Sequence, residues 1–128
     1  MKIKLTVMHA NEVIEALKKA GGIDLNPAVR KSVTDMFNRA AKAGAAGGGT
    51  PVDSGELRVS RSVEFGELEG EFGYTKEYAP HVEYGHRVVI GGEEVGYVEG
   101  QHFLQQNMEA QEPIFLQDVN GIIEEAIE

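Results

Sequence analysis

The 128-residue sequence contains neither cysteine nor tryptophan. The lack of cysteine excludes disulfide bridges, zinc sites with thiolate ligands and cysteine nucleophiles. No apolar run approaches the roughly 20 residues that a bilayer span needs, and residues 1–10 lack the charge and hydrophobic pattern of a signal peptide. We therefore expect a soluble protein made inside the cell, with no membrane as a partner.

Basic residues are scarce as well: 12 Lys and Arg stand against 21 Asp and Glu, for a formal net charge of -9. No basic cluster is dense enough to neutralise a row of phosphates, so tight binding of nucleic acid is not expected. An acidic surface most simply keeps monomers apart in solution. The alternative is that part of this surface lines a passage along which DNA moves without binding.

The length and the 41% apolar content fit a single domain with one hydrophobic core. Its predicted fold class is α+β, with a small antiparallel sheet packed against two N-terminal helices and a C-terminal helix. Within the single domain 1–128 we expect a helical part at 1–43, a flexible glycine-rich loop at 44–49, a strand-rich part at 50–99 and a closing helix at 101–127.

The N-terminal part is predicted as one strand followed by two helices. Alternating apolar and polar residues at 2–7 are typical of an edge strand. A first helix is expected between Asn11 and the glycines at 21–22. A second helix begins at 26–27, where proline occupies its first position, and apolar residues follow at helical spacing. The loop at 44–49 lacks the Gly-Lys-Ser/Thr ending of a phosphate-binding loop, so no nucleotide site is predicted there.

The first of two notable motifs is TPVDSGELRVS at Thr50–Ser60. Asp53 and Glu56 have the spacing of a capping box, in which each side chain accepts a hydrogen bond from the other residue's backbone amide. This pattern predicts a short helical turn at 55–59. We expect Leu57 to enter the core and the turn to have a structural role.

A catalytic role for the same motif would make Ser54 a nucleophile beside Asp53. No histidine lies nearby in the sequence, and the G-x-S-x-G pattern of a nucleophile elbow is missing. We therefore expect no enzymatic activity from this motif, and the capping role is favoured.

The strand-rich part contains two predicted antiparallel pairs. Segments 62–65 and 71–74 form the first pair. Segments 87–90 and 94–98 form a hairpin, whose Gly91-Gly92 turn supplies the positive φ angles of a two-residue turn. The hairpin tip is expected to project into solvent or toward a partner. Residues expected to point inward from the first pair are Val63, Phe65, Phe72 and Tyr74.

The second motif is YAPHVEYG at Tyr78–Gly85. Its alternation fits a strand, whereas Pro80 near the start and glycine at the end fit a helical turn. We favour the turn, which would stack Tyr78 over Val82. After the hairpin, apolar residues at helical spacing predict the closing helix packed across the sheet, with Pro113 interrupting or restarting it.

A metal site is one alternative function. His81 and Glu83 would share a face if the second motif were a strand, and His86 and His102 could join them as ligands for zinc or manganese. Isolated histidines at such spacing more often serve as polar packing or surface groups. We therefore predict no bound metal and no cofactor.

The two motifs, at this separation and followed by a Phe-Leu pair that opens the closing helix, resemble the tail-completion or head-tail joining family of tailed bacteriophages. The resemblance covers nearly the whole chain. It rests on Thr50, Pro51, Val52, Asp53, Gly55, Leu57, Arg58 and Ser60, on Tyr78, Ala79, Val82, Glu83 and Gly85, and on Phe103 and Leu104.

This resemblance implies a virion structural protein, made in the host bacterial cytoplasm, that forms a homo-oligomeric ring at the neck or tail end. The ring would join head to tail and let DNA pass through its lumen. Implied partners are further copies of the chain, a head-closure or adaptor protein, and a tail tube or tail terminator protein. Residues that could face the lumen or a partner are Glu67, Glu69, Glu71, Glu93 and Glu94.

Two further expectations concern contacts and class. Arg58 and Glu83 could form a polar pair that orients the two motifs or bridges neighbouring subunits. A different class of protein, a tail-assembly chaperone or another small cytosolic interaction module, would show the same acidic composition without entering the particle.

Overall fold

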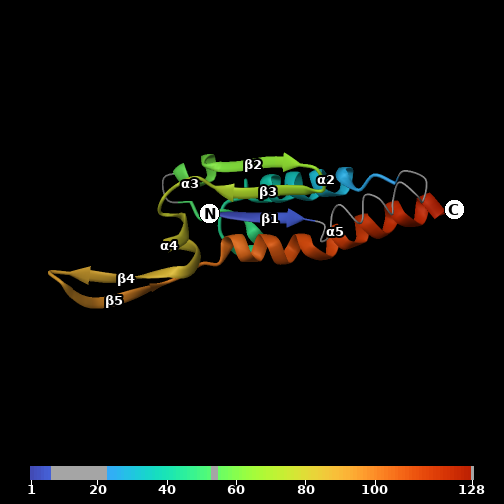
Figure 1. Cartoon of the computed structure of the whole chain (residues 1–128). Helices are drawn as coiled ribbons and strands as arrows, with labels where there is room; N and C mark the ends of the chain where they lie inside the picture. The colour runs from blue at the N-terminus through green and yellow to red at the C-terminus, as the bar shows by residue number, and fades with distance from the viewer. Residues whose placement is uncertain (7–22, 53–54, 128) are drawn as a thin grey trace.

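The computed structural model describes residues 1–6, 23–52 and 55–127 (Figure 1). The fold class is α+β, as predicted, with two small antiparallel sheets. The helix expected at 11–20 lies outside the described residues. The elements are β1 Lys2–Thr6, α2 Asn26–Arg39, the 3₁₀ turn η1 Ala46–Gly48, α3 Glu56–Val59, β2 Arg61–Gly66, β3 Glu69–Tyr74, α4 Ala79–Tyr84, β4 Gly85–Ile90, β5 Glu93–Glu99 and α5 Phe103–Ile127.

The larger sheet has the strand order β1-β3-β2, so β1 is an edge strand, as its alternating sequence predicted. Ile3 of β1 lies opposite Phe72 of β3, and both belong to the packed core. The other face carries charges: the Lys2 Nζ lies 3.4 Å from a Glu71 oxygen and the Lys4 Nζ 3.4 Å from a Glu69 oxygen. One face of this sheet is therefore core and the other is solvated.

The inward set predicted from the first strand pair is only half right. Phe72 and Tyr74 of β3 are buried, but Val63 and Phe65 of β2 are 36% and 47% exposed. Val63 lies opposite Phe72 in the ladder and so shares its face. It stays exposed because β2 is the outer strand, where the sheet has no further neighbour on that side.

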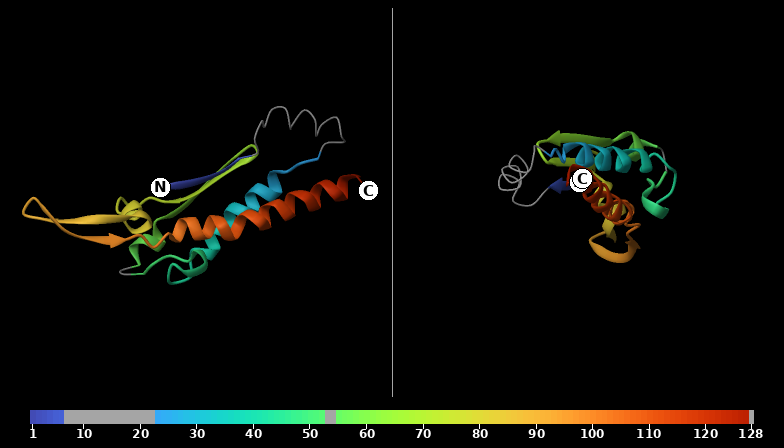
Figure 2. Two further views of the ribbon diagram at one scale, coloured as in Figure 1. Left: turned by 90° about the horizontal axis from the view of Figure 1, so that it is seen from below. Right: turned by 90° about the vertical axis from the view of Figure 1, so that its right-hand side faces the viewer.

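Helix α2 packs on the inner face of the sheet, and α5 packs against α2 (Figure 2). The predicted start of α2, with an early proline, is confirmed, and its residues Val29, Val33 and Met36 are buried at helical spacing. Gly70 of β3 allows the close approach, because a Cβ there would lie 2.5 Å from a Val33 methyl carbon. The helix ends at Arg39, two residues before the last apolar residue of its pattern, Ala41, which is exposed.

Helix α5 runs without a break through Pro113, which corrects the expected interruption. Proline removes one backbone hydrogen bond but does not end a helix that neighbouring groups hold in place. Here Asn107 donates to the Met36 carbonyl at 2.9 Å, and Gln111 donates to the Ser32 hydroxyl at 2.9 Å. These contacts to α2 lie directly before the proline.

The start of α5 packs on the sheet, as predicted for a closing helix. The rings of Phe103 and Tyr74 meet edge to face, with centroids 5.0 Å apart. Phe103 is fully buried. The sheet, α2 and α5 therefore share one core, which is completed by Leu57 of α3 and Ala79 of α4.

The glycine-rich segment 44–49, expected as a flexible loop, contains η1 and packs against α5. The Gly47 amide donates to the Gln106 side-chain oxygen at 3.2 Å. A Cβ at Gly48 would lie 2.6 Å from the Asn107 Cα, so only glycine fits there. The role of these glycines is close approach to a helix as well as turning.

Strands β4 and β5 form the predicted hairpin, which projects away from the rest of the molecule (Figure 1). Gly91 and Gly92 at its tip have φ angles of 61° and 84°, as a two-residue turn requires. We call Gly85–Glu99 the arm. It forms a separate two-stranded sheet with no third strand among the described residues.

Candidate functional site

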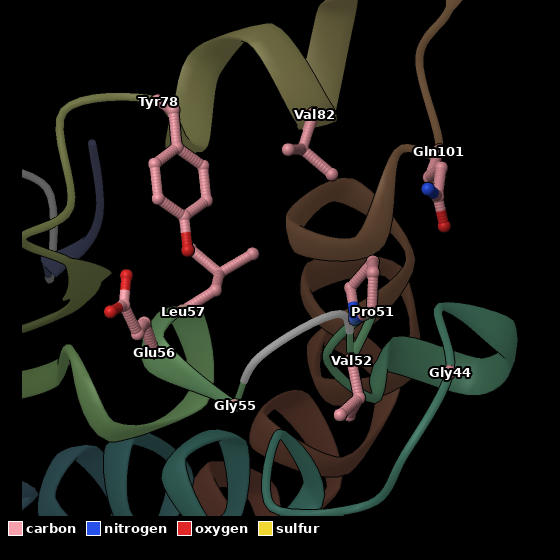
Figure 3. A pocket seen from close by; sticks show the side chains of 9 residues that line it. All are labelled: Gly44, Pro51, Val52, Gly55, Glu56, Leu57, Tyr78, Val82 and Gln101. Carbon is pink, nitrogen blue, oxygen red and sulfur yellow. The ribbon is translucent and has the colours of Figure 1, made fainter.

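The two sequence motifs line the same open pocket, with a volume of about 700 Å³. Figure 3 shows Tyr78 and Val82 of the second motif on one side, and Leu57, Pro51 and Val52 of the first motif facing them. The lining is mostly apolar. Its nine residues are Gly44, Pro51, Val52, Gly55, Glu56, Leu57, Tyr78, Val82 and Gln101.

Thr50 anchors the first motif to the core. Its buried hydroxyl donates to the Ala40 carbonyl at 2.6 Å and lies 2.7 Å from the Tyr74 hydroxyl. A threonine hydroxyl has one proton, which the Ala40 carbonyl takes because a carbonyl can only accept. The Tyr74 hydroxyl is therefore the donor to Thr50. One side chain thus joins the end of α2, the start of the motif and the central strand.

Replacing Tyr74 by phenylalanine tests this anchor. We expect Tyr74→Phe to lower the free energy of unfolding by about 1 kcal/mol near neutral pH, the usual net value of one hydrogen bond. Burial raises the pKa of Tyr74 above its ordinary 10.0. The tyrosine of the unfolded chain therefore ionises first, so the wild type loses stability as pH rises past this value. Tyr74→Phe has no hydroxyl to ionise at this position, so its stability does not fall with pH for this reason.

Urea unfolding of both proteins at about pH 8 and about pH 10.5 measures the effect, since these values bracket the ordinary tyrosine pKa. The stability gap between wild type and Tyr74→Phe should narrow at the higher pH. An equal gap at both values would contradict the buried, neutral hydroxyl.

The turn predicted in the first motif is confirmed as α3, whose N-cap is Gly55 with a φ of 83°. Leu57 is 4% exposed, so its core assignment is also confirmed. Ser60 closes the turn by donating its hydroxyl proton to the Leu57 carbonyl at 2.8 Å. Asp53, the other half of the predicted capping box, lies outside the described residues, as does Ser54.

The second motif is the predicted helical turn, α4, rather than a strand. Pro80 lies in its first positions and Gly85 ends it with a φ of 87°. The Val82 amide donates to the Tyr78 carbonyl at 3.3 Å, which places both side chains on the pocket side (Figure 3). Ala79 is fully buried beneath them.

Glu83 of the second motif caps α5, a role that the sequence analysis missed. Its two carboxylate oxygens accept hydrogen bonds from the Leu104 amide at 2.7 Å and the Gln105 amide at 3.0 Å. Glu83 is 2% exposed, and its carboxylate lies at the helix N-terminus, where free amides and the helix dipole favour negative charge. The sequence held one sign of this role. His102, directly before α5, is not a residue type that usually caps a helix, so the capping group had to come from elsewhere in the chain.

The pair expected between Arg58 and Glu83 does not form within the chain. Arg58 donates instead to the Ala41 carbonyl at 3.4 Å, and the Glu83 oxygens are engaged at α5. The two motifs are held together by apolar contacts around Leu57 and Val82 and by the shared core.

The alternative metal site loses one of its ligands for the same reason. Glu83 points into the protein, while the rings of His81 and His86 meet edge to face with centroids 5.6 Å apart. Among residues 1–6, 23–52 and 55–127, no three side chains of the metal-binding types cluster together.

The glutamates expected at a lumen or a partner fall into two groups, one on the larger sheet and one on the arm that projects away from it (Figure 1). Glu67, Glu69 and Glu71 lie at the β2–β3 turn and along β3, and two of them face lysines of β1. Glu93 and Glu94 lie at the arm tip. The lysines reduce the net negative charge of the first group.

The arm, whose root lies beside the pocket, carries exposed apolar side chains along its length. Val89 and Ile90 of β4 are 59% and 67% exposed, and Val95 and Tyr97 of β5 are 57% and 58% exposed. A two-stranded hairpin is only marginally stable by itself. Side chains of this kind at a projecting tip are typical of a contact with another molecule.

No family model, curated protein or solved structure matches the chain at a significant level. Among the described helices, none is both long and apolar enough to cross a bilayer.

Proposed function

We propose that the chain is a structural protein of a tailed bacteriophage, forming a ring at the neck or tail end that joins head to tail and lets DNA pass. One observation carries this proposal: both motifs that resemble the tail-completion family line a single open apolar pocket at the root of an exposed arm. The motifs therefore shape a surface that suits assembly.

A ring requires each subunit to present two different surfaces that fit each other, because its contacts run head to tail. The described residues offer such a pair in the arm and the pocket. The net charge of -9 suits a lumen through which DNA moves, since negative walls do not bind phosphates. One of the two glutamate groups would then face the lumen.

Mass spectrometry of purified particles tests the proposal. The particles are those of a phage whose genome encodes the chain. The chain should be present in several copies per particle and should remain after washing in high salt. The major tail protein of the same particles provides the internal standard.

The second candidate function is a tail-assembly chaperone. The exposed arm favours it too, because a chaperone also needs an accessible apolar surface. The same measurement separates the two: a chain that is abundant in the infected cell and missing from finished particles would contradict the structural role.

A further inference from the structure

We propose that the arm of one copy docks in the pocket of the next copy, so that arm-in-pocket contacts join the ring. This inference rests on the proposed function and names the contact by which the ring would form. The occupant of the pocket is thus a second copy of this chain.

The arm has one face suited to this contact. Strand alternation places His86, Val88 and Ile90 of β4 on one face, and the ladder places Val98 of β5 opposite His86 on that same face. Ile90 and Val98 are 67% and 47% exposed. Apart from His86 at the root and Glu93 opposite Ile90 near the tip, this face is aliphatic, and the described residues of the same chain leave most of Ile90 open to solvent.

The arm of a copy is directed away from its own pocket. The root of the arm lies at the edge of the pocket. Val82, before the arm in the sequence, and Gln101, after it, both line the pocket, and the arm runs outward from there (Figure 1). The Gln101 amide donates to the Val82 carbonyl at 2.8 Å, which closes the root of the arm. At Gly85 a Cβ would lie 2.5 Å from the Val98 carbonyl oxygen, so the root is tightly packed.

The contact is expected to use the face of the arm, and not the strand edge. A register shift between Val88 and Val89 interrupts the ladder midway along the arm. Such bulges twist an edge and discourage pairing with a further strand. The alternating face is undisturbed on either side of it.

A second copy fits the pocket by the apolar character of both surfaces and by size. Glu56 is the one acid among the nine lining residues of the pocket. The face of the arm that carries Ile90 also has one acid, Glu93, which lies opposite Ile90 in the ladder. Burial of the remaining apolar surface would favour the contact. A standard interface uses about 20 to 30 residues from each partner. The arm, with six residues in β4, seven in β5 and two in the turn, supplies about half of them.

Crosslinking tests the contact directly, because the chain has no cysteine of its own. Ile90→Cys and Val52→Cys, made in separate copies, are coexpressed and oxidised. We expect a disulfide-linked dimer of the two variants. The matched control is Val89→Cys, because this neighbour is 59% exposed and points to the opposite face of the arm. Crosslinking of the control to Val52→Cys at an equal yield, or no crosslink from the Ile90 pair, would overturn the docking.

Complementation of two assembly-defective variants tests the head-to-tail arrangement. Ile90→Asp removes a competent arm and Val52→Asp a competent pocket, so each should self-associate at least about 30-fold more weakly, as when a buried interface anchor is lost. When the two variants are mixed, the intact arm of Val52→Asp can dock in the intact pocket of Ile90→Asp. The mixture should therefore form dimers that do not grow further, because no second competent contact remains. Val89→Asp is the control and should assemble normally.

The outcomes separate the two proposals. If Ile90→Asp assembles and enters particles like the wild type, the docking is wrong and the structural role stands. If the wild-type chain itself is missing from particles, the proposed function is wrong, whatever the crosslinking shows.

Discussion

Phe103→Ala should lower the free energy of unfolding by about 3 to 5 kcal/mol, the range for a fully buried phenylalanine. Phe103 is 0% exposed, and its ring packs against Tyr74 of the central strand. The truncation would leave a cavity where α5 meets the sheet. Chemical denaturation followed by circular dichroism measures the loss.

Phe65→Ala is the matched control for this substitution. Phe65 lies on the outer strand β2 and is 47% exposed, and the Arg30 guanidinium lies 6.0 Å from the centre of its ring. It should lose about 1 kcal/mol, because much of its surface is already in water. Equal losses from the two substitutions would contradict the placement of Phe103 at the centre of the core.

Glu83→Ala should lower the free energy of unfolding by about 3 kcal/mol, because two hydrogen bonds to a charged group are lost and one buried and one part-buried amide are left without acceptors. The amides are those of Leu104 and Gln105. Hydrogen exchange at these two positions should speed up together. Denaturant unfolding gives the size of the loss.

Two variants sharpen this second test. Glu83→Gln keeps one acceptor oxygen without the charge, so its loss should be smaller than that of Glu83→Ala. Glu109→Ala removes an exposed carboxylate from the same helix and should stay within about 0.5 kcal/mol of the wild type. If Glu83→Ala behaved like Glu109→Ala, the capping role would be wrong.

Local patterns predicted the elements that are set by local physics. The apolar spacing after Pro27 identified α2, and the Gly91-Gly92 pair identified the turn of the arm, because a two-residue turn needs positive φ angles that glycine adopts freely. Pro80 and Gly85 likewise marked both ends of α4. In each case the signal lies within a few residues of its effect.

Contacts between distant residues were beyond the same reasoning. Glu83 caps a helix that begins twenty residues later, and no spacing rule connects them. Pro113 did not break α5, because Asn107 and Gln111 fasten the preceding turn to α2. Phe65 was predicted to point inward from its alternation, which gives the face of a strand but not whether another element covers it.

The candidate site was predicted in part. The sequence singled out both motifs, and the structure brings Leu57 of the first and Tyr78 of the second to the same pocket. The sequence also predicted that the tip of the hairpin projects, but not that its strands carry an exposed apolar face, with Ile90 67% exposed. Strand alternation in a short hairpin does not reveal whether another element covers either face.

Electron cryo-microscopy of the neck and tail end of particles that contain the chain tests the central claim most directly. The predicted result is a closed ring of this chain in which each arm, with Ile90 buried, occupies the neighbour's pocket beside Val52 and Tyr78. Particles without a ring of this chain at either position would contradict the claim.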